Sequence, residues 1–324
     1  MRLSPLVVVV PALLLACPAP PTGEGEGEGE GEGEGEGEEG EGEGEGEGEG
    51  EGEGEGEGEP ACGDVVVVGN TITNTEGLVV ARDGTLYYSQ PNAVGRRTAA
   101  GVVDDAWVAV PGAGTMWGVM LSPDNSQLYA ASPSTSSVFV IDVATEAILF
   151  ELDGFDGPNG LTVDAAGTLF VADFFADEVY ALEIGASAAA TAQTLVTDEV
   201  FAPNGVLVDG DDLLVLGYND GKLHRAVAGR LGAASSVSDA ATGLGNPDGI
   251  VRAADDTLYV TDNGSGRLLH IEGGVGVEVA RNIRAAANLE FGTAPLRCDR
   301  LLVTSADDLV VVDVGVAGAP VVWR

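Results

Sequence analysis

Six short phrases along the chain each present a polar or aromatic side chain directly before a glycine, or before the leucine that replaces it in the last phrase. We call them the leading residues: Glu76, Trp117, Asn159, Asn204, Asp248 and Asn288. The set contains two carboxylates and three carboxamides, and hard divalent cations such as Ca²⁺ prefer such oxygen donors. It contains no thiolate or imidazole that would suit a softer metal. Brought together, these side chains predict a site for a divalent cation.

Some of these residues also allow a structural interpretation. Asn-Gly and Asp-Gly are common turn dipeptides, so the phrases at Asn159, Asn204 and Asp248 could simply mark turns into strands. Glutamate is a poor turn residue, which argues against this interpretation at Glu76. Trp117 could offer a substrate an apolar platform, or it could fill the core.

The spacing of the phrases predicts the element that positions them. The residue after each leading residue falls at 77, 118, 160, 205, 249 and 289, so the steps are 41, 42, 45, 44 and 40 residues. A repeat of this length with short strands is typical of a β-propeller with one four-stranded blade per repeat. No long stripe with helical periodicity competes with this interpretation. The sequence therefore predicts an all-β, six-bladed propeller.

Within each repeat we expect an innermost strand at the phrase, a tight turn and a second strand, as in Asn159–Asp173. Third strands are expected at Ser137–Asp142, Glu178–Leu182, Lys222–Arg225 and Arg267–Ile271, with Leu309–Val314 in the last blade. Approximate sixfold symmetry then brings the leading residues to one height around the axis. There Glu76 and Asp248 would repel each other unless one took up a proton or a cation bound between them.

Two segments could complete the last blade. Val65–Val68 would join the start of the domain to its end and remove an exposed sheet edge, and Val321–Trp323 is the other choice. Cys62 and Cys298 remain after the leader, and a pair of cysteines in an exported protein favours a disulfide bond. Two free buried thiols are the alternative.

The first 17 residues have the layout of a secretory signal: Arg2, an apolar run over Leu6–Leu15, then a small-residue cleavage site. The ending Leu14-Leu15-Ala16-Cys17 resembles the lipobox of bacterial lipoproteins, in which the cysteine carries the lipid. Pro18 stands where an inner-membrane retention aspartate would lie, so this resemblance implies an outer-membrane or cell-surface protein. An ordinary signal peptide with Cys17 incidental is the alternative.

Residues 18–60 form an acidic spacer in which glycine and glutamate alternate almost without interruption. Such a tract cannot bury apolar surface, so we expect it to be disordered. Residues 61–324 then form the propeller domain. Without the 19 glutamates of the tract, 34 acidic residues face 14 basic ones, and the remainder still carries a net charge of −20. This charge excludes nucleic acid as a partner and argues against a basic membrane-docking face, so we expect membrane attachment only through the lipid.

Other catalytic arrangements find no support in the sequence. His224 and His270 fall in the expected third strands, remote from the axis, and no serine has a histidine partner that would indicate a Ser-His-Asp triad. The chain contains no P-loop or dinucleotide-binding fingerprint.

The phrases Glu76-Gly77, Pro203-Asn204-Gly205 and Pro247-Asp248-Gly249 resemble those of the SMP-30/gluconolactonase family. The resemblance covers essentially all of 62–324. It implies a six-bladed propeller with a divalent metal on its axis and hydrolysis of lactones or other esters. NHL-type propellers have similar blade phrases, so a non-catalytic module that binds a protein or glycan is the alternative.

The resemblance also implies roles for individual residues. Glu76, Asn204 and Asp248 match the metal ligands, Asn159 falls near a further site asparagine, and Asp248 matches the general base. We expect Ca²⁺ or another divalent cation as cofactor, with Trp117 and Asn288 contacting a small lactone or ester in a monomeric enzyme. Family enzymes that act on sugar acids have an Arg-x-Asn-Asp-Gly phrase in the third blade. Here the phrase is Asp156-Gly157-Pro158-Asn159-Gly160, without arginine, which disfavours both substrates with a carboxylate group and sugar lactones.

Overall fold

The structure is a computed structural model that describes residue 72 and residues 75–184, 192–227, 232–293, 299–306 and 309–319. The expected signal peptide, the acidic spacer and the lipidation site Cys17 lie outside these residues, as do Cys62 and Cys298. Among the residues described, none belongs to a helix with the length and apolar character needed to cross a bilayer.

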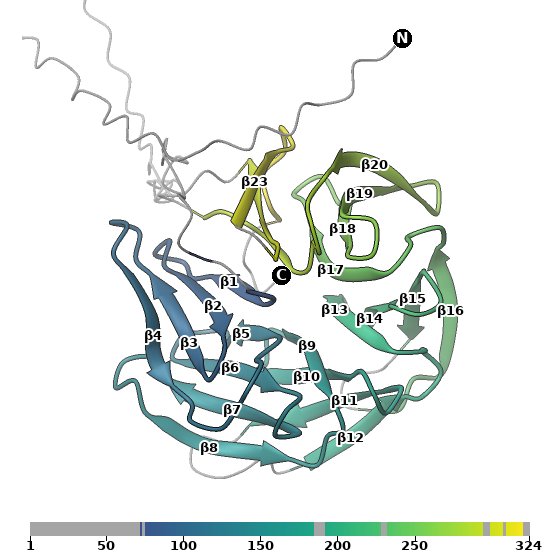
Figure 1. Ribbon diagram of the computed structural model, residues 1–324. Helices are drawn as coiled ribbons and strands as arrows, with labels where there is room; N and C mark the ends of the chain where they lie inside the picture. The colour runs from purple at the N-terminus through teal and green to yellow at the C-terminus, as the bar shows by residue number, and fades with distance from the viewer. Residues whose placement is uncertain are drawn as a thin grey trace, which may run out of the picture. The chain divides into compact units, whose positions relative to one another are not determined.

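The described residues form six antiparallel sheets around a common centre (Figure 1). The first sheet contains β1 (Leu78–Val80), β2 (Leu86–Gln90), β3 (Ala93–Arg97) and β4 (Val103–Ala109). The second contains β5 (Val119–Leu121), β6 (Gln127–Ser132), β7 (Ser137–Asp142) and β8 (Ile148–Asp153). The third contains β9 (Pro158–Val163), β10 (Thr168–Asp173), β11 (Glu178–Glu183) and β12 (Ala192–Thr197).

The fourth sheet contains β13 (Pro203–Asp209), β14 (Asp212–Gly217), β15 (Lys222–Val227) and β16 (Ser236–Ala241). The fifth contains β17 (Pro247–Arg252), β18 (Leu258–Asp262), β19 (Arg267–Glu272) and β20 (Val275–Arg281). The sixth shows β21 (Leu289–Phe291), β22 (Arg300–Thr304) and β23 (Leu309–Asp313) in its described part. Neighbours in each sheet follow chain order, so the predicted six-bladed β-propeller is confirmed.

Aspartates set the tight turns between the first and second strands of several blades. The Asp83 carboxylate accepts the backbone N–H of Thr85 at 2.9 Å, and the Asp255 carboxylate accepts that of Thr257 at 3.0 Å. Asp164 accepts the N–H of Thr168 at 2.8 Å in the same way. An aspartate that bonds its own turn favours reversal of the chain, so these hairpins are encoded locally.

The apolar core is divided into clusters that lie between neighbouring blades. Between the first and second blades, for example, Trp107 packs with Leu128 and Phe139. The ring is closed by a cluster in which Leu78 and Tyr88 of the first blade meet Leu302 and Leu309 of the last, together with Ile72. Inner strands such as β1 and β17 are buried on both faces, which explains why the residues after each leading phrase are mostly apolar.

Both segments proposed to complete the sixth blade, 65–68 and 321–323, lie outside the described residues. Just before the second of them, the Ala319 N–H donates to the Arg252 carbonyl at 3.1 Å, and Gly318 bridges to Ala253. The described end of the chain therefore pairs with the fifth blade.

Candidate functional site at the hub

Three of the leading residues lie in irregularities of the innermost strands. In β13, Pro203 pairs with Gly217 and Val206 with Val215, so Asn204 and Gly205 oppose one residue of β14. The same two-against-one arrangement holds Asn159 in β9 and Asp248 in β17. Such bulges re-aim side chains next to active sites. These residues lie within strands, so the turn interpretation is wrong for all three.

The glycine after each leading residue allows the blades to approach closely at the hub. A Cβ atom on Gly118 would collide with the carbonyl oxygen of Asn159 in the next blade, and one on Gly160 would collide with that of Asn204. Gly205 has the same relation to the Asp248 carbonyl. The repeated glycine is therefore required by the packing of one blade against the next, and it draws the leading residues toward each other.

Five of the six leading residues surround a cavity at one end of the propeller axis, which we call the mouth cavity. Its volume is about 540 Å³, within the roughly 300–1,000 Å³ typical of small-molecule sites. Glu76, Trp117, Asn159, Asn204 and Asp248 all line it. The structure thus brings together every residue that the sequence assigned to a metal site.

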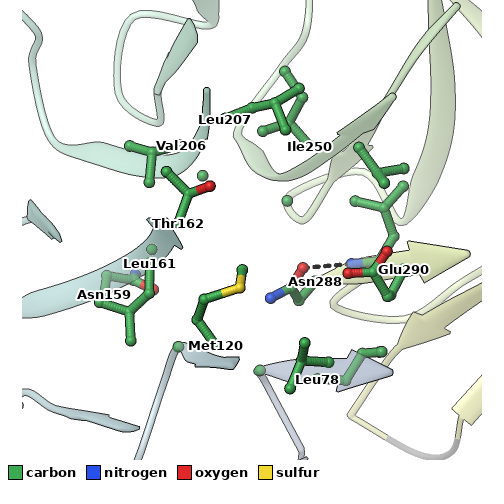
Figure 2. Close-up of a pocket in the computed structure, with 18 of the residues that line it drawn as sticks. Leu78, Met120, Asn159, Leu161, Thr162, Val206, Leu207, Ile250, Asn288 and Glu290 are labelled. Atoms are coloured by element: carbon green, nitrogen blue, oxygen red, sulfur yellow. Dashed lines mark hydrogen bonds between the residues drawn. The ribbon is translucent and has the colours of Figure 1, made fainter. Parts of the chain in front are cut away.

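The same five residues border a narrower space that continues along the axis, which we call the axial channel. Asn288 lines this channel and is not among the residues that line the mouth cavity. Its Oδ1 accepts the backbone N–H of Leu289 at 2.7 Å. Figure 2 shows the side chains of Asn288 and Met120 pointing toward each other between apolar residues such as Leu78 and Ile250. The position of Asn288 disfavours the predicted contact with substrate.

Glu76 and Asp248 form the electrostatic centre of the site, and we call them the acid pair. Asp248 is buried, and this burial raises the pKa of its carboxyl, partly offset by a hydrogen bond from the Asn204 side chain. Glu76 keeps some exposed area toward the cavity but is otherwise enclosed by protein. Its pKa is raised well above the ordinary value, first by desolvation and then by repulsion from Asp248. The site therefore contains two neighbouring carboxyl groups whose ionisation is unfavourable.

The donor set around the acid pair fits a hard cation. Asn159 and Asn204 are 5% and 3% exposed and line the same cavity as the acids, so their side-chain amides have little access to bulk water. The described residues contain no group of three or more acidic, histidine or cysteine side chains able to hold a metal. A cation here would need the carboxamide oxygens as well as the two carboxylates, which is a combination that Ca²⁺ accepts.

Hydroxyl groups on second strands support the backbone of the leading residues. The Ser89 hydroxyl accepts the Gly77 N–H at 2.9 Å, the Thr261 hydroxyl accepts the Gly249 N–H at 2.8 Å, and the Thr304 hydroxyl accepts the Asn288 N–H at 2.8 Å. Sequence analysis missed these residues. A sequence pattern could have revealed them, because each Ser or Thr lies three residues after the first leucine of an apolar second strand, as in Leu258-Tyr259-Val260-Thr261.

Four aromatic side chains form one side of the mouth cavity, and we call them the aromatic wall: Trp117, Phe174, Phe175 and Tyr218. Only Trp117 was predicted. Phe174 and Phe175 follow β10, and Tyr218 follows β14, so the three missed residues all come directly after second strands. Repeat analysis did not find them because the loops after these strands vary between blades.

The histidines and strand-end aspartates have structural surroundings. His224 and His270 lie in the third strands β15 and β19, and neither lines the mouth cavity or the channel. The Asp173 carboxylate accepts the N–H of Gly157 at 2.6 Å, and the Asp262 carboxylate accepts that of Asn246 at 3.0 Å. Both aspartates therefore fix the loop that leads into an inner strand.

Solved structures share this architecture. A gluconolactonase from Xanthomonas campestris is 20% identical over 75% of this chain and 86% of its own, with a TM-score of 0.61. A luciferin-regenerating enzyme is 15% identical over 77% of this chain and 94% of its own, with a TM-score of 0.61. Virginiamycin B lyase from Staphylococcus aureus is 14% identical over 75% and 85%, with a TM-score of 0.54.

No protein-family model matches the chain, and no curated protein matches it by sequence. At these identities the structural likeness establishes the six-bladed propeller fold. Among its structural neighbours are gluconolactonase-type propellers, the group that the blade phrases resemble.

Proposed function

We propose that this protein is a hydrolase of lactones or esters that depends on a divalent cation, with Ca²⁺ as the first candidate. The observation that carries the proposal is the acid pair. Glu76 and Asp248 converge on the axis, and no Lys, Arg or His is among the described residues that line the mouth cavity or the channel. A bound cation would offset the repulsion and desolvation that raise the pKa of both carboxyls.

Glu76, Asp248, Asn204 and Asn159 would hold the ion. When bound, such an ion polarises a carbonyl oxygen and stabilises the negative charge that develops on it. The chain's own contribution is to hold these oxygens at one height through the bulges and the inter-blade contacts of the glycines. The burial of Asp248 limits the access of bulk water to its carboxylate.

We also assign the role of general base to Asp248, because its carboxylate lines the mouth cavity at the place where the ion would be held. It would take a proton from a water molecule whose oxygen forms the new bond to the carbonyl carbon. The bond between that carbon and the alkoxy oxygen then breaks, and the proton passes to the departing oxygen. The products are a carboxylic acid and an alcohol, or one hydroxy acid from a lactone.

The structural neighbours give secondary support. A gluconolactonase is among the chains with the same fold, but one fold hosts many functions, so the argument rests on the site. Exported, lipid-anchored attachment through Cys17 is part of the proposal and rests on the sequence alone.

The test is calorimetric titration of the purified, chelator-treated protein with Ca²⁺, followed by an ester and lactone screen with and without chelator. We expect one ion per chain and hydrolysis that stops in chelator. Asp255→Asn is the matched control, because Asp255 forms a turn remote from the hub and asparagine supports the same turn. Absence of ion binding in the unmutated protein would overturn the proposal.

A binding module without catalysis is the second candidate. Phe175 and Phe201 are 58% and 55% exposed, and a hydrogen bond of 2.7 Å from the Ala202 N–H to the Asp177 carboxylate joins the two loops that carry them. Exposed aromatic residues are frequent in protein-binding surfaces. Ion binding without turnover of any substrate in the screen would favour this candidate.

A further inference from the structure

We infer that the substrate is an uncharged ester or lactone with an aryl ring, and that the ring is held against the aromatic wall with Phe174 as the main specificity-determining residue. The inference rests on the proposed function and deepens it by naming the substrate class of the same site.

Phe174 lies at the centre of the wall. Its ring centroid is 6.0 Å from that of Trp117, 5.3 Å from that of Phe175 and 5.5 Å from that of Tyr218. The interplanar angles of 72°, 87° and 67° are those of edge-to-face packing, a favourable arrangement for aromatic pairs. The four rings therefore brace each other and form a pre-organised apolar surface that costs little entropy when a ligand binds.

The wall lies in the same cavity as the acid pair. Trp117 is both a leading residue at the hub and a member of the wall, so the apolar surface begins where the proposed chemistry takes place. Burial and the charges of Asp248 and Glu76 raise the pKa of Tyr218, because its ring lies in the same cavity as both carboxylates. A substrate could therefore place its carbonyl near the acid pair and its ring on the wall.

Small side chains line other parts of the cavity. Ala285, Ala287 and Ala306 come from the segments around the last blade. Alanines leave room that larger residues would fill, so a cavity of about 540 Å³ can take a flat ring beside the wall. Thr75, Thr115 and Asn263 also line the cavity, but the part formed by these alanines and by the phenylalanines of the aromatic wall offers no polar partners for the hydroxyl groups of a sugar ring.

The charges around the mouth cavity disfavour an anionic substrate. No described residue that lines the mouth cavity is basic, so an anionic group would have no ion-pair partner other than the proposed metal. The remainder of the chain outside the Gly-Glu tract carries a net charge of −20, which repels anions at a distance. Once a divalent cation neutralises the acid pair, an uncharged substrate fits the site best.

The kinetic test compares phenyl acetate with methyl acetate in the unmutated protein, in Phe174→Ala and in Phe201→Ala. Phe201 is the matched control, since it is aromatic and exposed but does not line the cavity. We expect Phe174→Ala to lower the ratio of kcat/KM for phenyl acetate to that for methyl acetate by about tenfold. An unchanged ratio in Phe174→Ala, or an equal fall in Phe201→Ala, would overturn the inference.

A binding test separates this inference from the proposed function. Dihydrocoumarin and phenol are titrated into calcium-loaded and calcium-free protein and followed by saturation-transfer NMR, with gluconolactone as the polar comparison. If no ester is hydrolysed but the aromatic ligands bind and Phe174→Ala abolishes their binding, the catalytic proposal fails and the binding preference stands. Phenyltrimethylammonium and tert-butylbenzene, which have the same shape but differ in charge, are compared in the calcium-loaded protein. Stronger binding of gluconolactone than of the aromatic ligands would overturn the preference for an aryl ring, and stronger binding of the cation than of tert-butylbenzene would overturn the preference for an uncharged ligand.

Discussion

The hydroxyl group of Thr304, on the second strand of the last blade, donates a 2.6 Å hydrogen bond to the backbone carbonyl of Glu76 at the entry to the first blade. The Asn288 N–H donates to the same carbonyl at 3.3 Å. The first leading residue is therefore held by the last blade, 228 residues away along the chain. The backbone carbonyl of Glu76 therefore takes part both in closing the ring and in positioning one member of the acid pair.

Thr304→Val should lower both stability and calcium affinity, since valine keeps the shape of threonine but leaves the Asn288 N–H and the Glu76 carbonyl without this partner. Loss of a partner for buried polar groups costs about 1–3 kcal/mol. Urea denaturation measures the free energy of unfolding, and calorimetry measures the affinity. Thr304→Ser is the control and should stay near the unmutated protein. Equal behaviour of the valine and serine variants would contradict a role for the hydroxyl.

Asp248→Asn should have opposite effects on stability and on ion binding. The substitution removes a buried carboxylate whose ionisation is unfavourable beside Glu76, so the calcium-free protein should become more stable at pH 8. Calcium affinity should fall at least about a hundredfold, because a charged ligand is lost. Thermal unfolding with and without Ca²⁺ measures both effects. A variant that is destabilised without calcium would show that the acid pair carries no such repulsion.

The pH dependence of stability follows from the raised pKa of both acids. In the unfolded chain these carboxyls lose their protons near pH 4, whereas the folded, calcium-free protein keeps them to higher pH. The folded state then binds more protons than the unfolded state, so stability falls as pH rises above about 4 and through the raised pKa values. The gain in Tm on adding Ca²⁺ should accordingly be larger at pH 8 than at pH 5. A gain independent of pH would contradict the assignment of Glu76 and Asp248 as ligands.

Gly160→Ala should destabilise the ring, because the new methyl group meets the carbonyl oxygen of Asn204 in the next blade, which the sheet cannot easily move. Overpacking of this kind costs about 1–3 kcal/mol. Gly276→Ala in β20 is the control, since its methyl group would meet the methyl groups of Leu244 and Leu269, which can shift. Chemical denaturation compares the two. Similar losses in both variants would argue against a special requirement for glycine at the hub.

Cys17→Ser should abolish lipid attachment if the leader is that of a lipoprotein. Metabolic labelling with a radioactive fatty acid in a bacterial host, followed by membrane fractionation, tests this. The unmutated protein should carry the label and sediment with membranes. Label in the serine variant, or an unlabelled and unattached native protein, would favour an ordinary signal peptide.

The repeats determined the architecture without help from the tertiary structure. A strand has a side-chain period of two, and a hairpin needs its turn residues at fixed positions, so a phrase such as Asp164–Thr168 specifies its own fold locally. Six such phrases at nearly equal spacing imply six blades, and approximate symmetry alone places Glu76, Asn204 and Asp248 at equivalent positions around one axis.

Only the tertiary structure decided how those positions become a site. The bulges at Asn159, Asn204 and Asp248 form within single blades, where the first and second strands pair. The raised pKa of the acid pair and the Thr304 bond to Glu76 arise from contacts between blades, which no single repeat encodes. The aromatic wall joins loops of three different blades, with Phe174 at its centre. Cavities and electrostatic fields are sums over residues distant in sequence, so they exist only after the ring has closed.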